Sequence, residues 1–150
     1  MPSTNAIPTD QALLLDNQLC FALYSASLAM TKLYKPLLDE LGLTYPQYIA
    51  MLALWERDGL MVSELGERLS LDSGTLTPLL KRLEAAGLIA RIRAVEDERR
   101  VHITLTAAGR KLKSKAEKIP ACILAAAQMP LRELAQLKGQ LRDLRQRLAT

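Results

Sequence analysis

The stretch MVSELGERLSLDSGTLTPLLKRLEAAGLI, residues 61–89, contains two short helical patterns separated by a tight turn. Ser63 can cap a first helix that ends near Leu69, and Asp72 or Ser73 can cap a second helix that ends at Gly87. Hydroxyl side chains near the start of the second helix, followed by a Lys-Arg pair, are typical of a helix-turn-helix. We therefore expect the second helix to be one that enters the major groove of DNA.

The pattern changes after Gly87 from helical spacing to alternation. Apolar and polar residues alternate in LIARIRA (88–94) and in VHITLT (101–106), and the charged segment VEDERR (95–100) lies between them. Two alternating runs joined by a polar tip predict a β-hairpin. A hairpin directly after a helix-turn-helix predicts a winged helix, in which the hairpin can reach an adjacent groove or row of phosphates.

Helical patterns flank this unit on both sides. Residues 11–35 carry apolar side chains at spacings of three and four, which predicts one long amphipathic helix disturbed at Pro36. TYPQ, residues 44–47, matches a capping box, and the nearly all-apolar helix that follows should lie centrally. Residues 107–148 are again helical, with breaks at two prolines.

The last helical segment, residues 131–148, repeats leucine at spacings of three and four. A second subunit is the most economical cover for this stripe, and twofold symmetry would match a palindromic DNA site; the alternative is that the stripe folds back onto the core of its own chain. The predicted fold class is mainly α with a small β-hairpin, and its parts are a flexible arm (1–10) and a single domain (11–150) made of a winged helix-turn-helix (about 45–106) and dimerisation helices (about 11–40 and 107–148).

Composition and charge limit the class of protein. The 150 residues are 49% hydrophobic, enough for one domain with a core, and no signal peptide or membrane-spanning run is visible, so we expect a soluble, cytoplasmic protein without a membrane partner. The net charge is +4, but residues 81–118 carry eleven Lys and Arg against five Asp and Glu. This concentration favours a polyanion such as DNA as partner, although a solvated basic face is the simpler reading of charge alone.

The order of these elements, together with DERRVHITLT at residues 97–106, resembles the MarR family of dimeric transcription regulators. That segment carries the family's Asp-x-Arg followed by an alternating strand that ends in Leu-Thr. Two further segments, LCFALYSASLAMTKLYKPLLDELGLTYPQY (19–48) and LDSGTLTPLLKRLE (71–84), resemble the organic hydroperoxide resistance regulators (OhrR) within that family.

The resemblance implies a repressor that binds operator DNA when reduced and releases it when an organic hydroperoxide oxidises Cys20. It implies that Tyr24, Tyr34 and Tyr45 surround the thiolate. It also implies that Cys122, which resembles the second cysteine of the two-cysteine members, resolves the oxidised Cys20 in a disulfide between subunits; members without a second cysteine depend on a small-molecule thiol.

The residues themselves support a shared site around Cys20. At about 100° per residue, Tyr24 and Tyr34 lie about 40° to either side of Cys20 around a helix, so the three share one face. Tyr34 is about 21 Å farther along the axis and cannot touch Cys20 of its own straight helix, but it can reach Cys20 of an antiparallel partner. Phenols that donate hydrogen bonds to sulfur favour the reactive thiolate. Without this grouping, a lone cysteine is more often a packing residue.

The predicted DNA-contacting residues lie on the second helix and on the wing. Hydroxyls and charges near the helix start can reach base edges and phosphates. On the helix these are Asp72, Ser73, Thr75, Thr77 and Lys81, with Asp72 a possible cap instead. On the wing, Arg99 matches the family arginine that enters the minor groove, Asp97 is suited to orienting it, and Arg91, Arg93 and Arg100 are predicted phosphate contacts.

Two other functions are compatible with the sequence. The first is a MarR-type regulator that senses a small aromatic ligand, with inert cysteines. The second is a thiol peroxidase, although an enzyme has no use for a basic wing. No cofactor is predicted, and no metal site is predicted because His102, the only histidine, lies on the wing without a Cys/His cluster.

Overall fold

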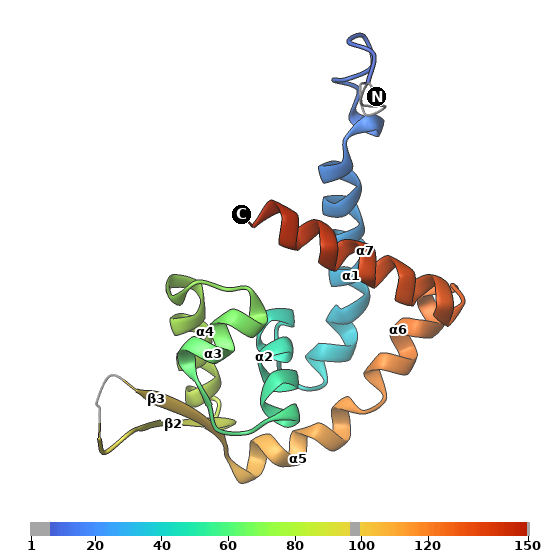
Figure 1. Ribbon diagram of the computed structural model, residues 1–150. Helices are drawn as coiled ribbons and strands as arrows, with labels where there is room; N and C mark the ends of the chain where they lie inside the picture. The colour runs from blue at the N-terminus through green and yellow to red at the C-terminus, as the bar shows by residue number, and fades with distance from the viewer. Residues whose placement is uncertain (1–6, 97–99, 150) are drawn as a thin grey trace. The chain divides into compact units, whose positions relative to one another are not determined.

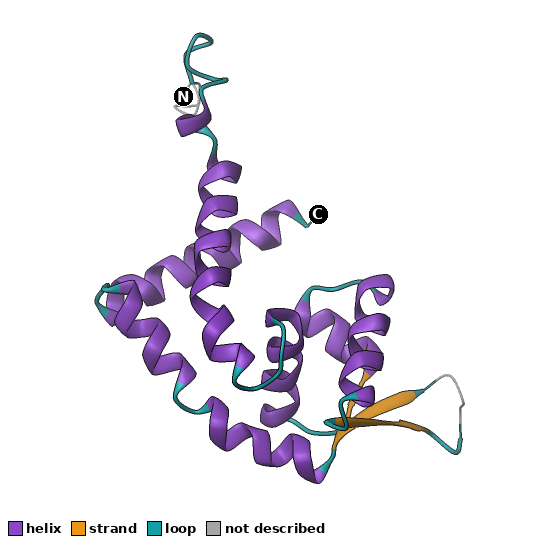
Figure 2. Ribbon diagram, turned by 180° about the vertical axis from the view of Figure 1, so that it is seen from behind, coloured by secondary structure: helices purple, strands orange, loops and turns teal. Residues whose placement is uncertain are grey.

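A computed structural model describes residues 7–96 and 100–149 of the protein. The fold is mostly helical with a small three-stranded antiparallel sheet (Figures 1 and 2). The chain divides into two compact units, residues 1–115 and 116–150, and the division falls within the segment predicted to serve dimerisation. The elements in order are η1 (Leu15–Asn17), α1 (Leu19–Asp39), α2 (Tyr45–Glu56), β1 (Leu60–Met61), α3 (Val62–Leu69), α4 (Ser73–Ala85), β2 (Ile89–Arg93), β3 (Val101–Leu105), α5 (Ala107–Ala116), α6 (Ile119–Ala127) and α7 (Leu131–Leu148).

The first unit contains the predicted winged helix-turn-helix. Strands β2 and β3 pair antiparallel, with Ile89 opposite Leu105, which confirms the hairpin. A third strand, β1, pairs Leu60 with Ile103 on the other side of β3, so the sheet order is β1-β3-β2. The sequence did not predict β1 because two residues are too few to show alternation.

Helix α2 lies at the centre of the first unit, as its apolar sequence predicted. It packs against α1, α3, α4 and β3. Met51 and Leu54 on α2 are completely buried, and so are Leu65, Leu83 and Ile103 on the surrounding elements. Because α2 packs against α1 as well as against α3, α4 and β3, a displacement of α2 would affect both sets of neighbours.

Local capping explains where α2 and α3 begin. Thr44 Oγ1 accepts from the Gln47 amide at 3.3 Å and Gln47 Oε1 accepts from the Thr44 amide at 2.9 Å, which confirms the capping box. Ser63 was predicted to cap α3, and this was wrong. The cap position is Met61, two residues earlier, and Glu64 Oε1 accepts from the Met61 amide at 3.1 Å. The carboxylate of Glu64 thus stabilises the start of α3 without a capping hydroxyl.

Helix α1 begins at Leu19, later than the sequence pattern predicted. Gln18 has an extended backbone, and its side-chain Nε2 donates to the carbonyl oxygens of Ala12 and Leu14, both at 2.8 Å. These bonds hold the preceding segment in turns, because side-chain amides compete with helical backbone bonds. Cys20 therefore lies in the first turn of α1 and not in the middle of a longer helix.

The same helix continues through Pro36 to Asp39, although the proline was expected to disturb it. Pro36 removes one backbone hydrogen bond near the helix end. Leu38, in the turn that follows, is only 3% exposed. Burial of this leucine offsets the missing bond and keeps the last turn helical.

Polar contacts of Trp55 near the end of α2, and of Asp58 just after it, hold the base of the wing and the start of α5 in place. Trp55 Nε1 donates to the Gly109 carbonyl at 2.9 Å. Asp58 Oδ1 accepts from the Leu105 amide at 2.9 Å, and Asp58 Oδ2 lies 3.7 Å from Arg110 Nη1. The wing and α5 are therefore anchored to the central helix at one place.

We expect Gly109→Ala to destabilise this junction. A Cβ atom at Gly109 would overlap the backbone carbonyl of Leu88, so the backbone must shift, at a cost of about 1–3 kcal/mol. Urea unfolding would measure it. The matched control is Gly74→Ala on α4, whose Cβ would lie 3.5 Å from Asp72 Oδ1, an ordinary contact, so this variant should be as stable as the natural chain or more stable. Equal stability of the two variants would contradict the close approach.

Candidate functional site

Cys20 is the second residue of α1 and is exposed. The partial positive charge of a helix N-terminus favours a negatively charged group in the first turn. Tyr24 follows one turn later and is 63% exposed, and the adjacent Leu19 and Phe21 are 59% and 38% exposed. Within one chain, Cys20 is thus an accessible thiol on an apolar helix surface, with one phenol nearby along the same helix.

Tyr34 lies toward the other end of α1, in a cluster with two tyrosines of α2. The ring centroids of Tyr34 and Tyr45 are 5.0 Å apart, so the structure brings together two of the three predicted phenols. The third member is Tyr48, whose ring centroid lies 5.8 Å from Tyr34 and 6.3 Å from Tyr45. The sequence analysis missed Tyr48, although its spacing of three from Tyr45 places both on one side of a helix.

Burial favours the protonated form of two of these phenols, Tyr34 and Tyr48. Burial, followed by the neighbouring Tyr45 and Tyr48, raises the pKa of Tyr34 to about 12. Burial and then Tyr45 also raise the pKa of Tyr48. Tyr34 is therefore a neutral hydroxyl at physiological pH, able to donate a hydrogen bond to a thiolate and unable to serve as a base.

The raised pKa of Tyr34 predicts a loss of stability at alkaline pH. The contribution is fully present below the ordinary value near 10 and is lost as the pH rises through about 12, because the unfolded chain releases the proton first. In the natural chain the urea midpoint should fall as the pH rises from near 10 to about 12. Near-ultraviolet absorbance should show that the last tyrosine to ionise does so near the upper pH. Tyr34→Phe should remove that transition and reduce the fall. Tyr24→Phe, at an exposed position, is the control and should retain both.

Cys122 is exposed in α6, the penultimate helix, in the second unit. This unit also presents exposed apolar side chains. Exposed leucines lie on α6 and along α7: Leu124, Leu131, Leu137, Leu141 and Leu148. The predicted leucine stripe is therefore present, and it lies largely at the surface of the single chain.

Helix α4 presents hydroxyl and basic side chains opposite its buried face. Ser73, Thr77 and Lys81 are exposed and follow one another at intervals of four, so they form a single row. Thr75 is exposed on the flank of this row, where its backbone amide donates to Asp72 Oδ1 at 2.8 Å. The predicted reading helix therefore carries three of its candidate contacts on one surface.

Asp72 is the cap of α4, the alternative that the sequence left open beside a DNA contact. Its carboxylate accepts from the Thr75 amide and then from the Thr75 hydroxyl, and these bonds lower the pKa of Asp72. The group is thus an anion held against the helix N-terminus. Asp72 therefore caps α4, and its role as a DNA contact stays a prediction.

The wing arginines differ in their partners. Arg91 donates from Nε and Nη2 to the two carboxylate oxygens of Glu84, each at 3.2 Å, and this pairing lowers the pKa of Glu84. Arg91 therefore links β2 to α4, and its predicted phosphate contact stays a prediction. Arg93, the last residue of β2, and Arg100, the residue before β3, are both exposed. Two further predicted contacts lie outside the described residues: Asp97 and Arg99.

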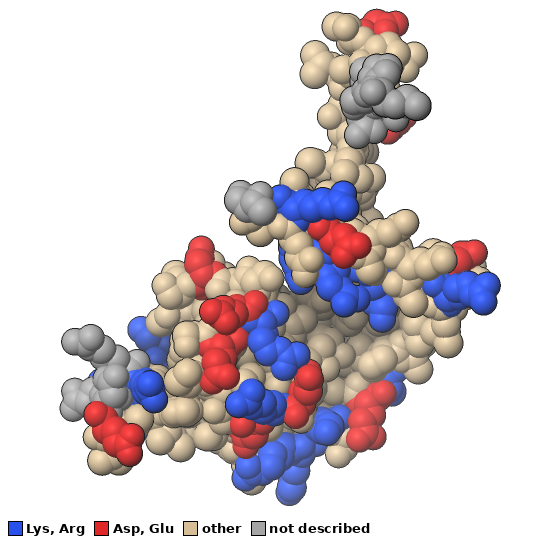
Figure 3. All heavy atoms as spheres, in the orientation of Figure 1, with Lys and Arg blue, Asp and Glu red and all other residues tan. Residues whose placement is uncertain are grey.

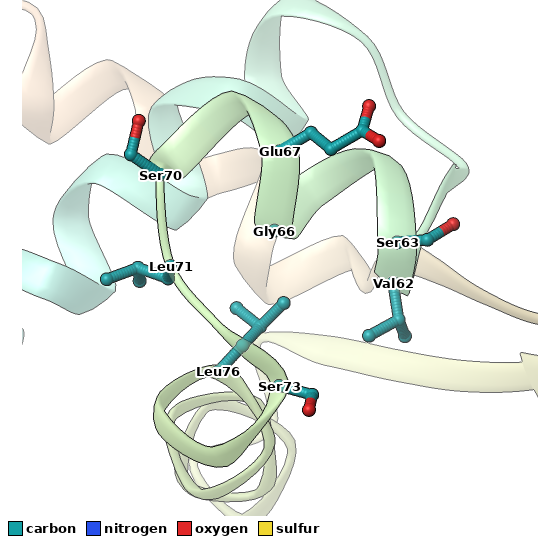
Figure 4. Close-up of a pocket in the computed structure, with 8 residues that line it drawn as sticks. All are labelled: Val62, Ser63, Gly66, Glu67, Ser70, Leu71, Ser73 and Leu76. Carbon is teal, nitrogen blue, oxygen red and sulfur yellow. The ribbon is translucent and has the colours of Figure 1, made fainter. Parts of the chain in front are cut away.

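Pockets in the described part of the first unit include one between α3 and α4 and one between α1 and α2. One, of about 280 Å³, lies between α3 and α4; Figure 4 shows Leu76 of α4 directed toward Gly66 of α3, with Ser63, Ser70 and Ser73 around the space. The other, of about 400 Å³, lies between α1 and α2 and is lined by Tyr45 among others. Its volume falls within the range of about 300–1,000 Å³ found for small-molecule sites.

The surface charge is uneven within the described part of the chain. Figure 3 shows Lys and Arg side chains gathered along α5, where Arg110, Lys111, Lys113 and Lys115 are exposed. In the described ranges, no three His, Cys, Asp or Glu side chains are grouped so as to hold a metal ion. No helix in those ranges is long and apolar enough to cross a membrane.

Comparisons with known proteins agree on one kind of protein. The family model described as transcriptional regulator SarA/Rot matches residues 32–116. The organic hydroperoxide resistance transcriptional regulator of Bacillus subtilis is 57% identical over 130 residues, 87% of this chain and 88% of that protein. A structure of PcaV from Streptomyces coelicolor with its natural ligand has a TM-score of 0.81 at 26% identity and covers 90% of this chain and 96% of that one.

AbfR, a protein of Staphylococcus epidermidis, is similar in three redox states. Reduced AbfR bound to DNA has a TM-score of 0.77 at 34% identity, covering 94% of this chain and 98% of that one. Overoxidised AbfR, also bound to DNA, has a TM-score of 0.79 at 33% identity, covering 95% and 100%. Disulfide-formed AbfR has a TM-score of 0.61 at 35% identity, covering 93% of each chain.

Proposed function

Because the chain belongs to the organic hydroperoxide resistance regulators of the MarR family, we propose that it is a two-cysteine, redox-sensing repressor that binds operator DNA when reduced. Its relatives are transcriptional regulators, so the thiol peroxidase is set aside and the chain is not an enzyme. The observation that carries the redox proposal is the division of the site along α1. Cys20 and Tyr24 lie at its start, and Tyr34, whose ring pairs with that of Tyr45 on α2, lies about 21 Å farther along from Cys20.

The two halves are complementary if two chains associate. In an antiparallel pair of α1 helices, Tyr34 and Tyr45 of one chain come level with Cys20 of the other. Apolar side chains that are exposed in the single chain, such as Phe21, Leu28 and Met30 on α1, support such an interface. The leucine stripe of α7 supports it in the same way. The homodimer, and with it a palindromic operator, is therefore part of the proposal.

The proposed chemistry is a two-step oxidation. The Cys20 thiolate attacks the terminal oxygen of an organic hydroperoxide; the O–O bond breaks, the alkoxide takes a proton and leaves as the alcohol, and Cys20 becomes a sulfenic acid. The Cys122 thiol of the partner then attacks that sulfur, forming an S–S bond and releasing water. In sum, one hydroperoxide is reduced to an alcohol and two thiols are oxidised to a disulfide.

The AbfR structures support the disulfide as the releasing step. AbfR is bound to DNA in both its reduced and its overoxidised structures, so overoxidation is compatible with binding there. In the present chain, a bond from Cys20 to Cys122 would link α1 of one subunit to α6 of the other. It would shift the helices to which the winged helix-turn-helix of each subunit is attached. Specific and non-specific DNA binding differ by about 4–10 kcal/mol, so a partial misalignment is enough for release.

The DNA contacts proposed for the reduced protein are the α4 row and the wing. Ser73, Thr77 and Lys81 would face the major groove, with Thr75 at its edge. Arg93 and Arg100 would meet phosphates. The roles of Arg99 in the minor groove and of Asp97 in orienting it remain proposals. A DNA-binding function also supports a cytoplasmic location.

The direct test is the affinity of reduced and oxidised protein for one DNA duplex. An operator can be selected from random-sequence DNA by the reduced protein, and cumene hydroperoxide added at one equivalent per subunit should then abolish specific binding. The rival is a regulator of a small aromatic ligand, which the pocket beside Tyr45 could hold. Release by an aromatic acid, with unchanged affinity after hydroperoxide, would favour that rival.

A further inference from the structure

Tyr48 is the buried member of the tyrosine cluster. It is 3% exposed, whereas Tyr45 is 40% exposed and Tyr34 is half-buried. We infer that Tyr48 is a positioning residue, whose ring holds the rings of Tyr34 and Tyr45 in the orientation that lets their hydroxyls reach the thiolate of the partner's α1. The inference rests on the proposed function, in which those two hydroxyls bind the Cys20 thiolate.

The ring geometry carries this inference. Tyr48 lies 5.8 Å from Tyr34 at 47° and 6.3 Å from Tyr45 at 49°, within the range of about 4.5–7 Å where tilted aromatic rings attract one another. It therefore contacts both outer phenols at once. Tyr34 comes from α1 and Tyr45 from α2, so Tyr48 also sets the distance between the two helices at this point.

Tyr48 is itself held firmly. Its backbone amide donates to the Thr44 carbonyl at 2.9 Å, in the first turn that the Thr44–Gln47 capping box closes. The base of the cluster is therefore a fixed turn of helix. The outer phenols gain their orientation from this base, and orientation decides whether a hydroxyl can bond to sulfur, because hydrogen bonds weaken steeply away from linear geometry.

The test separates the ring of Tyr48 from its hydroxyl. In a Cys122→Ser background, Cys20 is the only thiol, and its alkylation by iodoacetamide at neutral pH reports the thiolate in the intact dimer. Tyr48→Phe keeps the ring and should alkylate within about twofold of the parent, whereas Tyr48→Leu should be about tenfold slower. The pH of half-maximal alkylation should be higher in Tyr48→Leu than in the parent, and Tyr48→Phe should restore the parental value.

Controls distinguish positioning from general destabilisation. Leu54→Ala removes an equally buried α2 side chain away from the cluster; it should lower stability and leave Cys20 alkylation unchanged. Should Tyr48→Leu fail to fold, Tyr48→Met fills the space without a ring and should give the same loss. Operator binding by the reduced variants shows that each is folded.

Two results would overturn the inference. One is alkylation of Cys20 at the parental rate in Tyr48→Leu or Tyr48→Met; the other is a slowing in Tyr48→Phe as large as that in Tyr48→Leu. A double-mutant cycle adds a second criterion, because Tyr34→Phe should slow alkylation less in the Tyr48→Leu background than in the parent. Additive effects would also overturn it. Release of operator by hydroperoxide is measured separately, so a chain that fails to respond to hydroperoxide refutes the proposed function without altering the alkylation result.

Discussion

The Cys20→Ser protein is expected to stay on its operator in the presence of cumene hydroperoxide, whereas the natural chain dissociates. A serine hydroxyl is not a nucleophile toward peroxides at neutral pH, so neither the sulfenic acid nor the disulfide can form. Because loss of specific contacts is worth about 4–10 kcal/mol, oxidation of the natural chain should weaken operator binding about a thousandfold or more. Fluorescence anisotropy of labelled operator, before and after oxidation, measures the difference.

Reduced Cys20→Ser and reduced natural protein should bind the operator equally, since the exposed Cys20 on α1 lies outside the winged helix-turn-helix. Methionine offers the main competing explanation, because the chain has five and Met30 on α1 is 43% exposed. If Cys20→Ser still dissociates, Met30→Leu should be tested next. Continued release by the serine variant would rule out Cys20 as the sensor.

The Cys122→Ser protein is expected to stop at the sulfenic acid. Without a resolving thiol and without added small-molecule thiols, one oxygen stays on Cys20 and no covalent bond joins the subunits. Mass spectrometry should find a dimedone adduct on Cys20, and a non-reducing gel should lack the dimer-sized band of the natural chain. On the pattern of AbfR, which binds DNA when overoxidised, this variant should also retain most of its operator affinity.

Mixed dimers sharpen this experiment. A dimer of one Cys20→Ser chain and one Cys122→Ser chain keeps one complete pair between subunits, and that single disulfide should be enough to give the dimer band. If the pairing were within one chain, that mixed dimer could form no disulfide at all, and the natural protein would run as a monomer on the gel. The band in the mixed dimer therefore decides between the two connectivities.

The winged helix could be predicted from sequence because its signals are local. Glycine stops, hydroxyl and carboxylate caps and the change from helical to alternating spacing all act within a few residues, and α4, β2 and β3 appear where these signals place them. The errors are also local. The start of α1 was placed too early because the competing bonds of the Gln18 side chain to Ala12 and Leu14 leave no mark on apolar spacing.

The candidate site could be predicted only in part. Helical spacing showed that Cys20 and Tyr24 share a face and that Tyr34 lies too far along to complete the site within one chain. It could not show that the ring of Tyr34 would pack against the tilted ring of Tyr45, since the two come from different helices. Nor could it tell that Arg91 would be paired with Glu84, because an ion pair between a strand and a helix depends on how the two elements cross.

By itself the sequence determined the order of the helix-turn-helix and the hairpin, the helix start at Thr44, and the position of a cysteine one turn before a tyrosine. Backbone geometry and short-range hydrogen bonds are sufficient for these features. Only the tertiary structure decided that Tyr48 lies at the base of the phenol cluster and that Asp58 ties α2 to the wing. Such contacts join segments that meet only when apolar faces are buried, and burial is a property of the whole fold.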